Sequence, residues 1–243
     1  MSAATIVFVH GWGTDKDVWQ TLQTELKPLS CIALSLPGYG DQYDNTTEWK
    51  LDSLAEDLKM RSPANAIWVG WSLGGLLAAA TATFYPQHVK ALFTIGTTPC
   101  FTQRADWDCA MNESTFETFK QSCQENKEEC LKQFHKLIAV GANKATSKQA
   151  RKLICTASSA TLLKGLEILE NTDLRPAFGK LSCPTHQLFA ANDALVPVAV
   201  SQEIKSHSNK IDISIINDAS HALPLSHSKV IAQHIKARIH AEY

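Results

Sequence analysis

Residues 67–84 read IWVGWSLGGLLAAATATF, and this stretch decides the fold. A β-branched and aromatic run leads into the pattern Gly-x-Ser-x-Gly, and an Ala- and Leu-rich helical pattern follows it. This order of strand, sharp turn and helix is typical of a nucleophile elbow, which holds Ser72 exposed at the carboxyl end of a strand. Gly70 and Gly74 fit that interpretation because a Cβ at either position would collide with neighbouring backbone. The competing interpretation is a glycine-containing turn whose serine only caps the helix.

Composition limits the class of protein. The 243 residues fit one large α/β domain or one domain with an insertion, and 44% apolar and 19% charged residues are typical of a soluble globular chain. A net charge of −1 argues against an overall nucleic-acid binder. The sequence contains no apolar run of the roughly 18–20 residues that span a bilayer, and no signal peptide is visible. Seven scattered cysteines favour reduced thiols and therefore a cytoplasmic protein. No cluster of His and Cys has the spacing expected of a zinc site.

Strand and helix patterns alternate along most of the chain. Strands are expected at 5–10, 30–36, 67–71, 89–95, 184–190 and 211–216, and helices at 16–27, 51–60, 73–84, 198–206 and 227–241. This alternation predicts a parallel sheet covered on both faces. Between about 100 and 166 only helical patterns occur, which indicates an inserted helical cap. The expected division is therefore a core at 1–99, a cap at 100–166 and a second core segment at 167–243.

An activated serine needs a base and an acid that orients the base. His221 is the expected base, because it lies between the last strand and the last helix and so at the same sheet edge as Ser72. Asp193 follows the strand before it and is the expected acid. Asp218 is the poorer candidate because it shares a tight loop with His221. The order serine, aspartate, histidine is the order found in α/β hydrolases.

An oxyanion hole needs two backbone N–H donors. Leu73 directly follows the nucleophile and is expected to supply one. The segment His10-Gly11-Trp12-Gly13 follows the first strand, and the Trp12 N–H is the expected second donor. The Trp12 ring can also wall an acyl pocket or simply fill the core. Ester hydrolysis by such a site requires no metal and no cofactor.

Charge is unevenly distributed in the cap region. Residues 131–166 contain no Asp or Glu, and six of their basic side chains are candidates for a docking surface: Lys132, Lys136, Lys144, Lys148, Arg151 and Lys152. Like charges four residues apart destabilise a helix, and an acidic partner would neutralise them. The alternative is an ordinary solvated face.

Several motifs together resemble one family of α/β hydrolases, the pimeloyl-[acyl-carrier protein] methyl ester esterases of biotin synthesis. The resemblance covers nearly the whole chain and is carried by His10-Gly-Trp-Gly13, Gly70-Trp-Ser-Leu-Gly-Gly75, Pro99-Cys-Phe101, Gly165-Leu-Glu-Ile-Leu169, Asp173-Leu-Arg175 and Ala219-Ser-His-Ala222. It implies hydrolysis of the methyl ester of pimeloyl-[acyl-carrier protein] by a protein expected to be a monomer. It also implies an acyl chain held between core and cap, against Trp12, Leu73, Phe134 and Ile138. Its partner would be the acidic acyl carrier protein.

The sequence departs from the family pattern in two respects. Only a few residues precede the first strand, so the usual N-terminal hairpin is missing and a sheet of about six strands is expected. Cap arginines of the family correspond to Gln133, Thr146 and Ala150 or Arg151, with lysines shifted along the helix. Two other functions stay open: a general short-chain carboxylesterase acting on small free esters, and a non-catalytic binding protein with the hydrolase fold.

Overall fold

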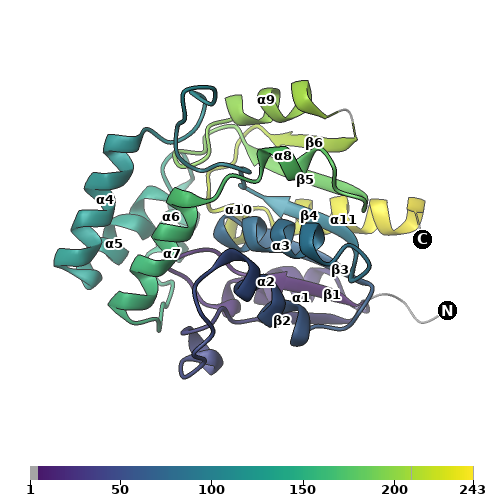
Figure 1. Cartoon of the computed structure of the whole chain (residues 1–243), viewed down its shortest axis with the longest axis horizontal. Coiled ribbons are helices and arrows are strands. Elements are labelled where there is room, and N and C mark those ends of the chain that lie inside the picture. Colours follow the sequence, from purple (N-terminus) through teal and green to yellow (C-terminus); the bar gives the residue numbers. More distant parts are fainter. Residues whose placement is uncertain (1–4, 209, 243) are drawn as a thin grey trace.

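Six parallel strands form the central sheet of the computed structural model, which describes residues 5–208 and 210–242 (Figure 1). The strand order is β2-β1-β3-β4-β5-β6. The strands are β1 (Ile6–Val9), β2 (Cys31–Leu34), β3 (Ala66–Trp71), β4 (Val89–Ile95), β5 (Thr185–Ala190) and β6 (Ile211–Ile216). The predicted parallel sheet of about six strands is therefore confirmed.

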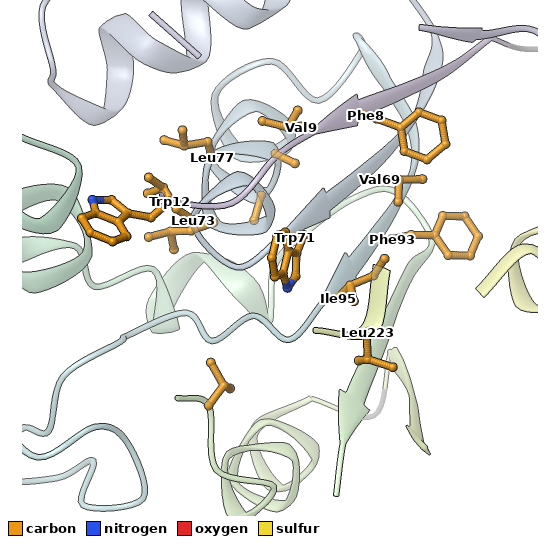
Figure 2. Packing of buried hydrophobic residues seen from close by; sticks show 14 of the residues in the cluster. Phe8, Val9, Trp12, Val69, Trp71, Leu73, Leu77, Phe93, Ile95 and Leu223 are labelled. Carbon is orange, nitrogen blue, oxygen red and sulfur yellow. The ribbon is translucent and has the colours of Figure 1, made fainter. Parts of the chain in front are cut away.

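The central strands are apolar on both sides because helices cover both faces of the sheet. All residues of β1, β3 and β5 are buried, as expected for strands inside a parallel sheet. Phe8 pairs with Val69, and Val69 pairs with Phe93, so these three side chains form a row on one face. Figure 2 shows this row, with Trp12 placed beyond the end of β1.

Helices α2 and α3 pack together on one face, and α1 and α11 pack together on the other (Figure 1). The helices of the core are α1 (Gln20–Glu25), α2 (Leu51–Met60), α3 (Leu73–Phe84), α8 (Arg175–Phe178), α9 (Ala199–His207), α10 (Leu223–Ser226) and α11 (Ser228–Glu242). Two 3-10 helices, η1 (Lys16–Trp19) and η2 (Gly40–Gln42), lie in the loops after β1 and β2. The helix expected over 16–27 is thus split, because the chain first makes a tighter turn that buries Val18 and Trp19.

Four helices gather over the carboxyl ends of the strands (Figure 1). They are α4 (Glu113–Glu125), α5 (Lys127–Leu137), α6 (Lys144–Ala150) and α7 (Ser159–Asn171). Each begins after a residue whose side-chain oxygen accepts a backbone N–H of the first turn, and these caps are Asn112, Asn126, Asn143 and Ser158. Helix α7 runs through residue 166 and returns the chain to the core, so the division of the chain at that residue stays a prediction.

Within the described ranges, no helix has the length and apolar character needed to cross a membrane.

Candidate active site

Ser72 lies on a strained turn between β3 and α3. Its backbone has φ 53° and ψ −121°, a conformation that non-glycine residues rarely adopt and that costs about 1–3 kcal/mol. The turn is tight because α3 starts directly against the end of β1: a Cβ on Gly74 would lie 2.2 Å from the Val9 carbonyl oxygen. The serine remains slightly exposed, at 8% of its surface, although its surroundings are buried. This is the geometry of a nucleophile elbow.

His221 and Asp193 form a buried pair. Their side chains are fully buried, and His221 Nδ1 lies 2.8 Å from Asp193 Oδ2. The other carboxylate oxygen accepts the backbone N–H groups of Leu195 and Val196, both at 2.8 Å. Since a carboxylate can only accept, Nδ1 carries the proton and Nε2 faces away from Asp193. Asp218 lies elsewhere, 3.3 Å from His227 Nε2, with 87% of its side chain exposed.

Contacts around Trp71 and Gly96 bring this pair next to the elbow. The Trp71 indole N–H donates to the His221 carbonyl at 2.9 Å, and the Ser72 N–H donates to the carbonyl of Ile95. The next residue, Gly96, has φ 51°, and a Cβ there would lie 3.2 Å from His221 Nδ1. Within the described residues, His221 Nε2 is buried without a hydrogen-bond partner. Nε2 is the atom through which a base acts on a serine, and such bonds are often long before substrate binds.

The two expected oxyanion donors come from neighbouring segments. Leu73 is the first residue of α3, and the start of α3 packs on the carbonyls of Val9 and His10. The loop that carries Trp12 leaves β1 at the same place (Figure 2). In the part of the chain that the structure describes, the backbone N–H groups of Trp12 and Leu73 donate to no protein acceptor. Free donors at a helix N-terminus and an adjacent loop suit a developing negative charge.

An apolar cavity lies between the elbow and the cap. Ser72 is on its wall, and the remaining lining consists of Trp12, Phe101, Met111, Thr115, Phe116, Phe119, Phe134, Leu137, Leu166, Leu169 and Leu195. The lining contains no charged side chain, so the cavity suits the hydrocarbon part of an ester.

Trp12 and Phe134 form the aromatic centre of this wall. Their rings meet edge to face with centroids 4.8 Å apart, and the Trp12 indole N–H donates to the Leu162 carbonyl at 2.8 Å. Ile138, also expected beside the acyl chain, is not among the lining residues. It is fully buried just after α5 ends, and its carbonyl accepts the Ala222 N–H, while Leu137 lines the cavity instead.

The six basic cap residues are not all in one place. Lys144, Lys148, Arg151 and Lys152 surround one shallow surface groove whose lining contains no acid. Lys132 and Lys136 are exposed on α5, and Lys132 lies 4.0 Å from Glu129.

Sequence reasoning did not identify several residues that support the site. Gly96 was missed because a single glycine after a strand carries little signal. Thr14 and His135 were missed because their role depends on carbonyls in a loop: Thr14 Oγ1 donates to Gly11 O at 3.0 Å, and His135 Nε2 lies 2.9 Å from Gly13 O. No group of three His, Cys, Asp or Glu side chains within the described residues could hold a metal ion.

Comparison with known proteins gives consistent matches. Residues 6–234 match the model of the alpha/beta hydrolase family. The chain is 35% identical over 231 residues to a pimeloyl-[acyl-carrier protein] methyl ester esterase of Xylella fastidiosa strain M12, covering 92% of this chain and 90% of the relative. It is 32% identical over 228 residues to the protein of the same name from Edwardsiella ictaluri, covering 91% and 88%.

Among solved structures, a hydrolase from Oleispira antarctica superposes with a TM-score of 0.88 at 18% identity, covering 98% of this chain and 91% of the other. An esterase from Exiguobacterium antarcticum superposes with a TM-score of 0.84 at 18% identity, covering 98% and 92%. At this level of identity the two structures establish the fold alone.

Proposed function

Because this chain belongs to the pimeloyl-[acyl-carrier protein] methyl ester esterase family of α/β hydrolases, we propose that it hydrolyses the methyl ester of pimeloyl-[acyl-carrier protein] in biotin synthesis. The products are pimeloyl-[acyl-carrier protein] and methanol. The observation that carries the proposal is the identity of 35% over 92% of the chain to a relative of that name. The apolar cavity beside Ser72 supports it, because a pimeloyl ester presents a hydrocarbon chain next to its reacting carbonyl.

In the proposed mechanism Ser72 is the nucleophile, His221 the base and Asp193 the acid. His221 Nε2 takes the Ser72 proton as Oγ attacks the ester carbonyl, and Asp193 stabilises the imidazolium that forms. The carbonyl oxygen becomes negatively charged and accepts hydrogen bonds from the Trp12 and Leu73 N–H groups. His221 then protonates the departing methoxide, which leaves as methanol. Water attacks the acyl-enzyme by the same route and releases the carboxylate.

The acyl chain occupies the cavity between core and cap in this proposal. Its methylene groups contact Trp12, Phe134 and Leu137, whose side chains line the wall. Burying a methylene group contributes about 0.8 kcal/mol, so a chain of several methylenes is enough to fix the ester beside Ser72. Since the wall carries no charge, binding there favours the methyl ester over the free carboxylate, and the product is expected to dissociate.

We further propose that the acyl carrier protein docks on the basic side of the cap. In this proposal Lys144, Lys148, Arg151 and Lys152 around the groove at α6 form the centre of the surface, and the exposed Lys132 and Lys136 of α5 are further candidates. Carrier proteins are acidic, and complementary charge increases both association rate and specificity. The proposal includes a cytoplasmic, monomeric enzyme, and the monomer is checked by size-exclusion chromatography with light scattering.

Two measurements test the function. Turnover of methyl pimeloyl-carrier protein is compared with turnover of free dimethyl pimelate, first in the wild type and then in Ser72→Ala. Loss of both activities in Ser72→Ala is expected, and ester turnover that survives would contradict the nucleophile assignment. Equal kcat/KM for the two esters in the wild type would favour the general short-chain carboxylesterase.

Charge reversal tests the docking surface. Lys148→Glu combined with Arg151→Glu is expected to lower kcat/KM for the carrier-bound ester at least tenfold and to leave the free ester unchanged. Lys180→Glu is the matched control, since it is also exposed but lies beside the far end of α3. Equal effects of the double variant on both substrates would contradict docking.

A further inference from the structure

The orientation of the Trp12 N–H is determined by the carbonyl of the preceding residue. The Gly11–Trp12 peptide is planar and trans, so its N–H points opposite to the Gly11 carbonyl. Gly11 O accepts the Thr14 hydroxyl at 3.0 Å and lies 2.9 Å from His10 Nδ1. Thr14 and His10 are both fully buried. Two donors on one carbonyl therefore fix the direction of the N–H on the other side of the peptide.

The hydrogen bonds of His10 identify which ring nitrogen is the donor. The Leu36 backbone N–H, which can only donate, lies 3.0 Å from His10 Nε2. Nε2 is therefore an unprotonated acceptor, and the proton of the neutral ring is on Nδ1, facing Gly11 O. Both lone pairs of the Gly11 carbonyl are then used by side chains of the same loop. Such a carbonyl also polarises its own peptide, which strengthens the N–H as a donor.

The Trp12 N–H itself has no protein acceptor in the described ranges, although Trp12 is 98% buried. Nearly all buried N–H groups in proteins are paired. Trp12 lines the cavity, so a donor left unpaired there, while its carbonyl is held by two side chains, is available to a group that arrives with the substrate.

We propose that Thr14 and His10 are positioning residues that hold the Gly11–Trp12 peptide so that the Trp12 N–H faces the oxyanion. This inference rests on the proposed function, since it assumes that an oxyanion forms beside Ser72. Thr14 is the residue to test, because its hydroxyl can be removed with little change in shape. Removing a whole oxyanion donor typically lowers kcat by about 10²–10³. A loosened donor is expected to cost less, on the order of tenfold.

The test compares Thr14→Val, Thr14→Ser and a control, Thr81→Val. Thr81 is also fully buried, and its hydroxyl donates to the Leu77 carbonyl at 2.9 Å within α3, away from the reacting groups. Thr14→Val is expected to lower kcat about tenfold with KM within about twofold. Thr14→Ser and Thr81→Val are expected to stay within about twofold of the wild type in both parameters.

A second readout separates positioning from a general structural role. A trifluoromethyl ketone forms a tetrahedral oxyanion with the serine, whereas the matching methyl ketone binds mainly as a ground-state analogue. Thr14→Val is expected to weaken binding of the trifluoromethyl ketone about tenfold and binding of the methyl ketone less than twofold. Unchanged kcat in Thr14→Val at an unchanged melting temperature would overturn the proposal. Equal weakening of both ketones would do the same.

A failure of the positioning role of Thr14 can be distinguished from a failure of the proposed function. If Ser72→Ala keeps its ester turnover, the nucleophile assignment fails, whatever Thr14→Val does. If the enzyme cleaves p-nitrophenyl esters but not the carrier-bound methyl ester, the substrate assignment fails, and Thr14 can still be tested with the aryl ester.

Discussion

Protonation of His10 is expected to destabilise the protein in mild acid. Burial lowers the pKa of His10 to about 4, and the hydrogen bond with Gly11 offsets only part of this effect. Protonation would place a second N–H against the Leu36 N–H, which now donates to Nε2 at 3.0 Å. Two donors would then face each other in a fully buried position.

Proton linkage gives the direction and the size of the change in the free energy of unfolding with pH. The unfolded chain binds a proton at His10 below a pKa of 6.5, whereas the folded chain binds it only near 4. The protein therefore has its full stability above pH 6.5, where His10 is neutral in both states, and loses stability as the pH falls toward 4. This difference in pKa corresponds to about 3 kcal/mol in total, of which about 2 kcal/mol is lost by pH 5.

Urea unfolding followed by tryptophan fluorescence at pH 7 and pH 5 measures the effect. His10→Gln is the comparison, because its side-chain carbonyl can still accept the Leu36 N–H and does not titrate. Other buried histidines, such as His135, whose pKa is also lowered by burial, contribute equally to both proteins. We expect the wild type to lose about 2 kcal/mol more than His10→Gln between the two pH values. A difference below about 0.5 kcal/mol would refute the reasoning.

Three further variants test other parts of the structure. Asp193→Asn is expected to lower kcat by about 10³–10⁴ with little change in melting temperature, because an amide can bond the wrong tautomer of His221; steady-state kinetics and calorimetry check this. Gly74→Ala would place a Cβ 2.2 Å from the Val9 carbonyl oxygen. The free energy of unfolding, measured in urea, is therefore expected to fall by roughly 4 kcal/mol or more. A melting temperature near that of the wild type would contradict this expectation. Phe134→Ala removes the edge-to-face contact with Trp12 and is expected to raise KM for the acyl substrate and to cost about 3 kcal/mol of stability. An unchanged KM would place the acyl chain elsewhere.

The core was predictable because its constraints are local in sequence. Strands buried on both faces must be continuous apolar runs, and the elbow needs glycine where the backbones of β1 and α3 meet. The closeness of His221 and Asp193 could be predicted because each follows a parallel strand, and parallel strands place their carboxyl ends at one edge. The distance of 2.8 Å between them could not be predicted, since it depends on Gly96 and on the Trp71 indole.

The cap was harder to predict because helix periodicity gives the face of a helix but not what that face packs against. Phe134 and Ile138 are four residues apart and share a face, since Ile138 keeps helical φ and ψ and its N–H donates to the Phe134 carbonyl. Phe134 nevertheless lines the cavity, whereas the carbonyl of the fully buried Ile138 accepts the Ala222 N–H. That partner lies more than 80 residues away along the chain, so no local pattern indicates it.

The same contact ties α5 to two loops of the candidate site. Just after α5 ends, the Ile138 carbonyl accepts the N–H of Ala222, the neighbour of His221. Three residues earlier, His135 Nε2 lies 2.9 Å from the carbonyl oxygen of Gly13, in the loop that carries Trp12. Phe134, next to His135, lines the apolar cavity. Because one helix makes all three contacts, a displacement of α5 would move the cavity wall and both loops together.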